Sequence, residues 1–180
     1  MSPLTARVEA LLFAAAEPVN PAALAQAAGV SEAEVGLALS ELTSHLEQEA
    51  HGFALAAVAG GYQLLTRREH AEAVTALLQR RRPPLSRASL ETLAVIVFRQ
   101  PVTRAEVDDL RGVRSEGALL TLVERGLVAE VGRDAGPGRP MRYGTTRRFL
   151  EHFGLRDLTD LDAAKAALAA RAAEAETPPG

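Results

Sequence analysis

The 180-residue sequence contains no cysteine, a single lysine and no long apolar run. Without cysteine, the chain has no disulfide framework and no thiolate ligands for a metal ion. No segment approaches the roughly 20 consecutive apolar residues that a membrane-spanning helix needs. The short apolar run near the N-terminus is interrupted by Glu9 and spaces its leucines as a helix does, which is not typical of a secretory signal peptide. We therefore expect a cytoplasmic protein without a membrane segment.

The sequence also lacks the residue patterns of an active site or a metal site. None of its four histidines belongs to an HExxH motif. Asp108 and Asp109 are adjacent, so on a helix their side chains point in different directions and do not form an acid–base pair. Residues 136–139 (GPGR) lack the lysine and the strand-to-helix setting of a phosphate-binding loop. We expect no enzymatic activity, no cofactor and no metal.

The clearest structural pattern lies in residues 85–131, which predict three helices followed by a strand. Apolar residues recur at helical spacing in residues 86–98 and predict a helix with one buried face. Thr103 and Glu106 have the spacing of a capping box at the start of the next helix, and Gly112 is suited to end it. Two helices joined by a short glycine-containing turn form a helix-turn-helix.

A third helix and a β-hairpin complete this pattern. Ser115 is placed to cap the third helix, which ends at Gly126. Residues 127–131 and 141–145 are strand-like, and the glycine-rich and proline-rich connection between them is longer than most hairpin loops. A helix-turn-helix followed by such a hairpin is a winged helix, in which the hairpin is the wing.

Motifs of the N-terminal half recur 83 residues later without a gap. The matched pairs are Pro18 and Pro101, Val19 and Val102, Gly29 and Gly112, Val30 and Val113, Leu37 and Leu120, Leu39 and Leu122, and Glu41 and Glu124. The first half also has helix start signals of its own, at Asn20–Pro21 and at Ser31–Glu34. This internal duplication predicts an α+β fold, mostly helical, that consists of two tandem winged-helix domains.

The predicted domain boundaries follow from this repeat. We place the N-terminal winged-helix domain at residues 1–79 and the C-terminal one at residues 86–157. Residues 80–85 between them (RRRPPL) are charged and stiffened by proline, as expected for a linker. Residues 158–180 become rich in alanine and end in Pro-Pro-Gly, which predicts a tail that is partly helical and then disordered.

Many winged helices bind nucleic acid, with the third helix in the major groove. In the first copy this helix, residues 31–50, carries five glutamates and neither lysine nor arginine, which argues against phosphate binding. Residues 86–153 have a net charge of +2 and five arginines near the wing: Arg133, Arg139, Arg142, Arg147 and Arg148. Three interpretations stay open for these arginines: pairing with local acids, an edge that binds a protein, and weak contact with a few phosphates.

Three long motifs resemble a known family. They are residues 85–113 (LSRASLETLAVIVFRQPVTRAEVDDLRGV), residues 122–133 (LVERGLVAEVGR) and residues 136–161 (GPGRPMRYGTTRRFLEHFGLRDLTDL). With the opening residues 10–26 they span most of residues 8–161. The sequence is similar to the segregation and condensation protein B (ScpB) family, the tandem winged-helix subunit of the bacterial Smc condensin-like complex.

The resemblance implies a function and partners. Members are non-enzymatic homodimers that bind the kleisin subunit ScpA and, through it, the Smc ATPase, in chromosome condensation and partition during the cell cycle and cell division. It implies dimerisation through the N-terminal domain, kleisin binding mainly through the C-terminal domain, a cytoplasmic and nucleoid-associated location, and little or no direct DNA binding. The alternative is a DNA-binding winged-helix transcriptional regulator.

The resemblance also suggests site residues. The family motif falls on Gln100, Pro101, Arg104, Arg111, Gly112, Val113, Gly138, Arg139, Pro140 and Tyr143. Of these we expect Arg104, Arg111, Arg139 and Tyr143 to be exposed and to bind the kleisin. Pro101, Gly112, Val113, Gly138 and Pro140 are expected to be turn and wing positions. The alanine-rich and leucine-rich N-terminal helices offer Leu11, Leu12, Leu39 and Leu46 as the dimerisation region.

Overall fold

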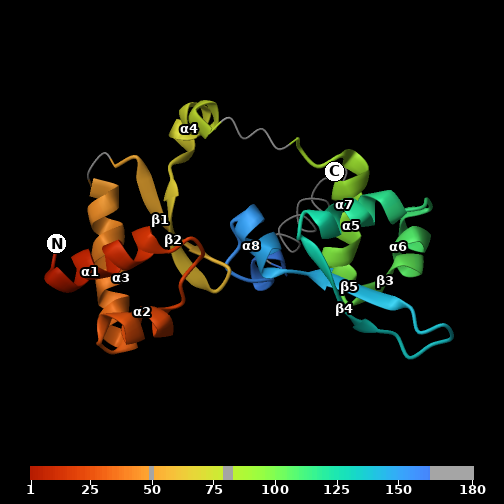
Figure 1. Ribbon diagram of the computed structural model, residues 1–180, viewed down its shortest axis with the longest axis horizontal. Coiled ribbons are helices and arrows are strands. Elements are labelled where there is room, and N and C mark those ends of the chain that lie inside the picture. Colours follow the sequence, from red (N-terminus) through yellow and green to blue (C-terminus); the bar gives the residue numbers. More distant parts are fainter. Residues whose placement is uncertain (49–50, 79–82, 163–180) are drawn as a thin grey trace, which may run out of the picture. The chain divides into compact units, whose positions relative to one another are not determined.

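The computed structural model describes residues 1–48, 51–78 and 83–162 (Figure 1). Residues 1–78 and 154–162 of this described part belong to one compact unit, and residues 83–153 belong to a second. Each unit combines helices with a small antiparallel sheet, which confirms the predicted α+β class. None of the helices in the described ranges is long and apolar enough to cross a membrane.

The first unit has three helices followed by a hairpin. Its elements are α1 (Pro3–Ala14), α2 (Pro21–Ala28), α3 (Glu32–Gln48), β1 (Phe53–Val58), β2 (Gly61–Thr66), the 3-10 helix η1 (Arg68–His70) and α4 (Ala71–Leu78). The predicted start signals are confirmed, because the Asn20 side chain caps α2 and Ser31 exchanges hydrogen bonds with Glu34 at the start of α3. Gly29 ends α2 with a left-handed φ of 70°.

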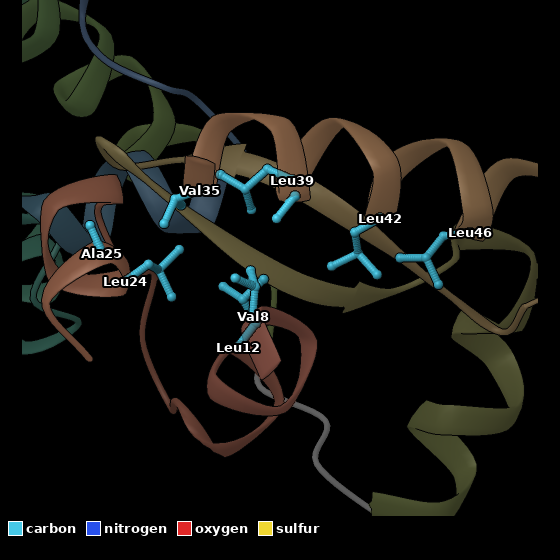
Figure 2. Close-up of a cluster of buried hydrophobic side chains, with 9 residues drawn as sticks. Val8, Leu12, Leu24, Ala25, Val35, Leu39, Leu42 and Leu46 are labelled. Carbon is cyan, nitrogen blue, oxygen red and sulfur yellow. The ribbon is translucent and has the colours of Figure 1, made fainter. Parts of the chain in front are cut away.

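The core of the first unit lies between α1, α2 and α3. Figure 2 shows Leu39, Leu42 and Leu46 of α3 pointing toward Val8 and Leu12 of α1. These side chains recur at the three-to-four-residue spacing of one helix face, so they fill the space inside the unit. The hairpin closes the remaining side of the core through partly buried residues: Phe53, Leu55, Tyr62 and Leu64.

This core corrects the expected dimerisation region. Leu12, Leu39 and Leu46 are only 2%, 4% and 1% exposed, and Leu11 packs against the same cluster. Residues that fill their own unit's core have no surface left for a second copy. The exposed large apolar residues of this unit are others, including Phe13, Leu37, Leu65, Leu77 and Leu78.

The second unit repeats the order of the first. Its elements are α5 (Arg87–Arg99), β3 (Val102–Thr103), α6 (Arg104–Arg111), α7 (Glu116–Glu124), β4 (Val128–Arg133), β5 (Met141–Thr145) and α8 (Arg147–Phe153). The sheet order is β3-β5-β4, so the short strand before the helix-turn-helix lies beside the second strand of the wing. Of the apolar residues that recur at helical spacing in α5, Leu93 and Ile96 are buried, whereas Leu90 is exposed.

The duplication extends to the strand pairing. Val19 bridges Tyr62 in the first unit, and Val102 pairs with Tyr143 in the second. The two valines are 83 residues apart and the two tyrosines 81, because α7 has 9 residues where α3 has 17 and the second wing has the longer loop. This shared pairing confirms that both copies are winged helices.

In the turn of the second helix-turn-helix, Ser115 forms hydrogen bonds other than the predicted helix cap. Thr103 and Glu106 form the expected capping box, and Gly112 ends α6 with a φ of 68°. Ser115 does not cap α7 with its side chain. Instead, its backbone N–H donates to the Asp108 carboxylate at 2.7 Å and its hydroxyl donates to the same carboxylate. These bonds lower the pKa of Asp108 and make it a structural residue of the turn.

The end of the second unit also differs from the predicted boundary. The sequence placed residues 154–157 in the C-terminal domain, but in the structure they group with the first unit. The backbone N–H groups of Ala59 and Gly60 donate to the carbonyls of Leu155 and Arg156 at 2.8 and 2.9 Å. Residues 163–180 of the predicted tail and residues 80–82 of the predicted linker lie outside the described residues.

Replacing a core leucine of α3 should destabilise the protein far more than replacing an exposed one. Leu46→Ala removes a side chain that is 1% exposed and should lower the free energy of unfolding by about 2–5 kcal/mol. Leu37→Ala, at a position on the same helix that is 74% exposed, should change it by less than about 0.5 kcal/mol. Urea unfolding followed by circular dichroism measures both. Equal effects would contradict the packing described here.

Glu41 makes the stability of the first unit sensitive to acid. The Thr5 hydroxyl donates to its carboxylate at 2.5 Å and the Ser2 N–H at 2.8 Å, and these bonds lower the pKa of Glu41 from 4.5 to about 2. Because the carboxylate of the unfolded chain takes up a proton at higher pH, its stabilising effect is complete above about pH 4.5 and disappears toward about pH 2. Glu41→Gln should therefore lower the urea midpoint at pH 7, and its difference from the unmodified chain should shrink between pH 4.5 and 2. Glu32→Gln, at an exposed glutamate of the same helix, is the control.

Candidate functional site

A groove of about 250 Å³ lies on the second unit. It is lined by Arg104, Glu116, Leu119, Leu120, Val123, Glu130 and Tyr143. Arg104 is the first residue of α6, the two strands of the wing contribute Glu130 and Tyr143, and α7 contributes the rest. The groove therefore brings together two of the four predicted partner-binding residues, Arg104 and Tyr143.

The polar residues of the groove are more acidic than basic. The Arg104 guanidinium pairs with the Glu116 carboxylate at 3.2 Å, and both side chains are exposed. Glu130 and Tyr143 are directly opposite each other on β4 and β5. Arg104 is thus the one arginine among the lining residues, beside two glutamates. A groove of this composition has no general attraction for an acidic ligand, and its charges favour a defined orientation of whatever binds.

The apolar residues of the groove are the more unusual feature. Leu120 is 58% exposed and Val123 is 38% exposed, both on the α7 surface beside the buried Leu119. Leu110 and Val113, at the end of α6 and in the turn, are also exposed. Apolar side chains of this size on the surface of a helix-turn-helix are typical of a protein-binding face.

Arg111 does not belong to this surface, and the expectation that it is exposed is wrong. Its side chain is 7% exposed and its guanidinium pairs with Glu91 of α5 at 3.1 Å. Glu91 also accepts a hydrogen bond from Arg87, and these two arginines lower the pKa of its carboxylate. Arg111 therefore joins α6 to α5 inside the unit.

The loop of the wing is organised by Asp134. Its carboxylate accepts a hydrogen bond from the Gly136 N–H at 2.8 Å and another from Arg142 Nε at 2.7 Å. Both bonds lower the pKa of Asp134. Arg139 is exposed in this loop with a left-handed φ of 43°, and it does not line the groove. The structure therefore separates Arg139 from Arg104 and Tyr143.

Two of the wing arginines match the interpretation of local pairing. Arg142 forms an ion pair with Asp134, and Arg147 lies 3.4 Å from Glu151 on the same helix.

The turn and wing positions lie where the sequence predicts them. Gly112 and Gly138 have positive φ, Val113 is exposed, and Pro101 follows the end of α5 while Pro140 precedes β5. Gln100 joins the end of α5 to β5, because its side-chain oxygen accepts a hydrogen bond from the Thr145 N–H at 2.6 Å.

Neither third helix of the described fold presents a face suited to phosphates. The exposed side of α3 carries glutamates, and α7 contains Glu116 and Glu124 but no lysine or arginine. Within the described ranges, no group of three or more His, Cys, Asp or Glu residues is placed to hold a metal ion. On the second unit, the apolar groove beside α7 is a candidate recognition surface.

Comparison with known proteins identifies the family. Residues 6–164 match the model of the family described as "Segregation and condensation complex subunit ScpB". The sequence is 52% identical over 158 residues to segregation and condensation protein B of Moorella thermoacetica, covering 88% of this chain and 81% of that protein. The chain belongs to the ScpB family.

Further similar proteins are another curated relative and two solved structures. Segregation and condensation protein B of Syntrophotalea carbinolica is 51% identical over 162 residues, with 90% of this chain and 82% of that protein covered. The crystal structure of ScpB from Mycobacterium tuberculosis is 40% identical and covers 84% of this chain and 95% of that chain, with a TM-score of 0.41. A structure described as a dimer of the ScpB N-terminal domain complexed with ScpA peptide is 36% identical and covers 42% of this chain and 94% of that chain, with a TM-score of 0.40.

In this ScpB-family chain, the two copies differ at the positions of the groove. The helix positions are matched by the 83-residue offset, and the strand positions by the residue that pairs with the wing tyrosine. The first unit has small or uncharged residues at the matched positions: Pro21 for Arg104, Ala33 for Glu116, Gly36 for Leu119, Ser40 for Val123 and Ala57 for Glu130. Only the exposed leucine, Leu37 or Leu120, and the wing tyrosine, Tyr62 or Tyr143, are shared. The charged and apolar lining is therefore particular to the second unit.

Several groove residues were missed from the sequence. Helical spacing predicts Leu119 and Val123 on the core face of α7; Leu119 is buried as predicted, whereas Val123 is 38% exposed. Glu116 and Glu130 belong to no predicted site. Val123 and Leu120 are exposed because the short α7 buries only two leucines, Leu119 and Leu122. One signal was present: Leu37 and Leu120 match across the repeat although both lie beside the core-facing positions of their helices.

Proposed function

We propose that this chain is a non-enzymatic scaffold subunit of the bacterial Smc complex, which binds the kleisin ScpA as a homodimer. In that role it acts with the Smc ATPase in chromosome condensation and segregation during cell division, in the cytoplasm at the nucleoid. Membership of the ScpB family supports this role. The observation that carries it is the groove of the second unit, where α7 presents leucine and valine and contains no lysine or arginine.

The groove suits a protein segment with an apolar anchor. Leu119, Leu120 and Val123 provide an apolar wall that a leucine or aromatic side chain of the partner can cover. The Arg104–Glu116 pair and Tyr143 lie at the same groove and offer a donor, an acceptor and a hydroxyl to polar groups of the partner. In the proposed complex the central segment of ScpA occupies this groove.

The first unit is proposed to mediate dimerisation. Its core residues are used internally, so the second copy must meet the exposed apolar residues, among which Phe13 is 84% exposed and Leu77 is 81% exposed. The helix α4 supports this assignment, because none of its residues is buried. A relative is described as a dimer of its N-terminal domain with an ScpA peptide, which agrees with a dimer formed through this unit.

A DNA-binding regulator is the less favoured function. It needs cations on a third helix, and neither α3 nor α7 contains lysine or arginine. Of the wing arginines, Arg142 and Arg147 are already paired with acids.

Leu120→Asp should weaken binding to the central segment of ScpA by at least about tenfold, because it places a charge on the apolar wall of the groove. The affinity is measured by titration calorimetry, and the mass of the complex by size-exclusion chromatography with light scattering. The unmodified full chain should elute as a dimer and form a stable complex with the segment. Leu90→Asp, at an exposed leucine of the same unit that does not line the groove, is the matched control.

The possible outcomes test ScpA binding and the location of the binding site separately. A stable complex that Leu120→Asp and Leu90→Asp affect equally would keep ScpA binding and place it elsewhere on the chain. Arg104→Glu, which leaves the groove without a cation, should weaken binding more at low salt than at high salt. Arg139→Glu, outside the groove, should change the affinity by less than about twofold. Absence of a complex, together with salt-sensitive binding of duplex DNA, would favour the regulator.

A further inference from the structure

The turn between β1 and β2 has an unusual residue at its first position. Ala59 and Gly60 have φ values of 50° and 72°, the pattern of a two-residue type I′ hairpin turn. Glycine, asparagine and aspartate are favoured at such positions, and alanine is not. Ala59 is nevertheless only 9% exposed, although it lies at the tip of a hairpin. Something must therefore cover this turn.

Residues from the far end of the chain cover it. The consecutive N–H groups of Ala59 and Gly60 donate to the consecutive carbonyls of Leu155 and Arg156, at 2.8 and 2.9 Å. Successive N–H groups in a turn form a concave site for oxygen atoms. Without these carbonyls, the two N–H groups would have only water as acceptor. The turn is thus a binding site for backbone carbonyl groups, and those of residues 155 and 156 occupy it.

The segment that supplies the carbonyls is braced by its own side chains. Arg156 Nη2 and Nε donate to the Asp160 carboxylate at 2.6 and 3.1 Å, and the Arg156 N–H donates to the same carboxylate at 2.8 Å. Asp157 accepts a hydrogen bond from the Thr159 N–H at 2.7 Å. Gly154, with a φ of 66°, lets the chain turn at the end of α8. These contacts hold the backbone of residues 156–160 in the shape that presents its carbonyls to the turn.

We propose that residues 154–162 form a strap that binds the Ala59–Gly60 turn, completes the first winged-helix unit and can be released from it. When the strap is bound, both the N-terminal and the C-terminal end of the second unit's sequence lead into the first unit. When the strap is released, only the N-terminal end does. The strap has the features of a segment of low local stability, because backbone hydrogen bonds to the hairpin turn attach it and its Leu158 is 40% exposed. This device goes beyond the proposed function and does not depend on ScpA binding.

Amide hydrogen exchange in the full chain tests the strap directly. The N–H groups of Ala59 and Gly60 should be protected in the unmodified protein, measured by NMR without any partner present. Asp160→Ala removes the brace on Arg156 and should increase exchange at these two sites by about tenfold or more. The amides of Leu42 and Leu46 in α3 should keep their exchange rates, which shows that the unit remains folded. Asp109→Ala, at an exposed aspartate of the second unit, should change neither group.

Two results would overturn the proposal. Ala59 and Gly60 amides that exchange in the unmodified chain at the rate of unprotected amides would show that the strap is not bound. Protection that Asp160→Ala leaves unchanged would show that the braced segment is not what covers the turn. Both exchange measurements are independent of whether the chain binds ScpA.

Discussion

The residues directly before each helix-turn-helix pair with the wing, and this pairing holds each winged helix together. In the second unit Val102 and Thr103 pair with Tyr143 and Arg142 of the wing, and in the first unit Val19 bridges Tyr62. The approach in the first unit is so close that a Cβ on Gly61 would lie 2.7 Å from the Val19 carbonyl carbon. This pairing joins the hairpin to the start of the middle helix. It therefore places Arg104, the residue after Thr103, beside Tyr143, and the groove depends on it.

Duplication provided two copies of this arrangement, and the copies then differ in what they expose. The first unit keeps a leucine and a tyrosine at the groove positions but has small uncharged residues around them. The second unit adds an ion pair, a further glutamate and an exposed valine. Since both copies share the fold, this difference in side chains is the basis of the separate roles proposed for them. The proposed protein-binding groove on one unit and the proposed self-association through the other use the same backbone arrangement.

Much of the fold was predictable because its signals are local. Capping residues such as Asn20 and Thr103 satisfy N–H groups within their own first turn, so their effect is visible in a short window of sequence. The repeat added the tertiary information that a single copy would not have supplied. Ser115 shows the limit: its hydroxyl had two acceptable uses, and only the position of the Asp108 carboxylate, seven residues earlier, decided between them.

The sequence by itself determined the helices, the tandem winged-helix architecture and the family, because each rests on spacing along the chain. The tertiary structure decided which residues are exposed to solvent and available for binding. Leu12, Leu39 and Leu46 became core, Arg111 was buried against Glu91, and Arg104 and Tyr143 came together with Leu120. It also joined residues 154–162 to a hairpin nearly a hundred residues earlier. Burial and long-range contact depend on how elements pack in three dimensions, and periodicity along one helix cannot specify which neighbour covers its other faces.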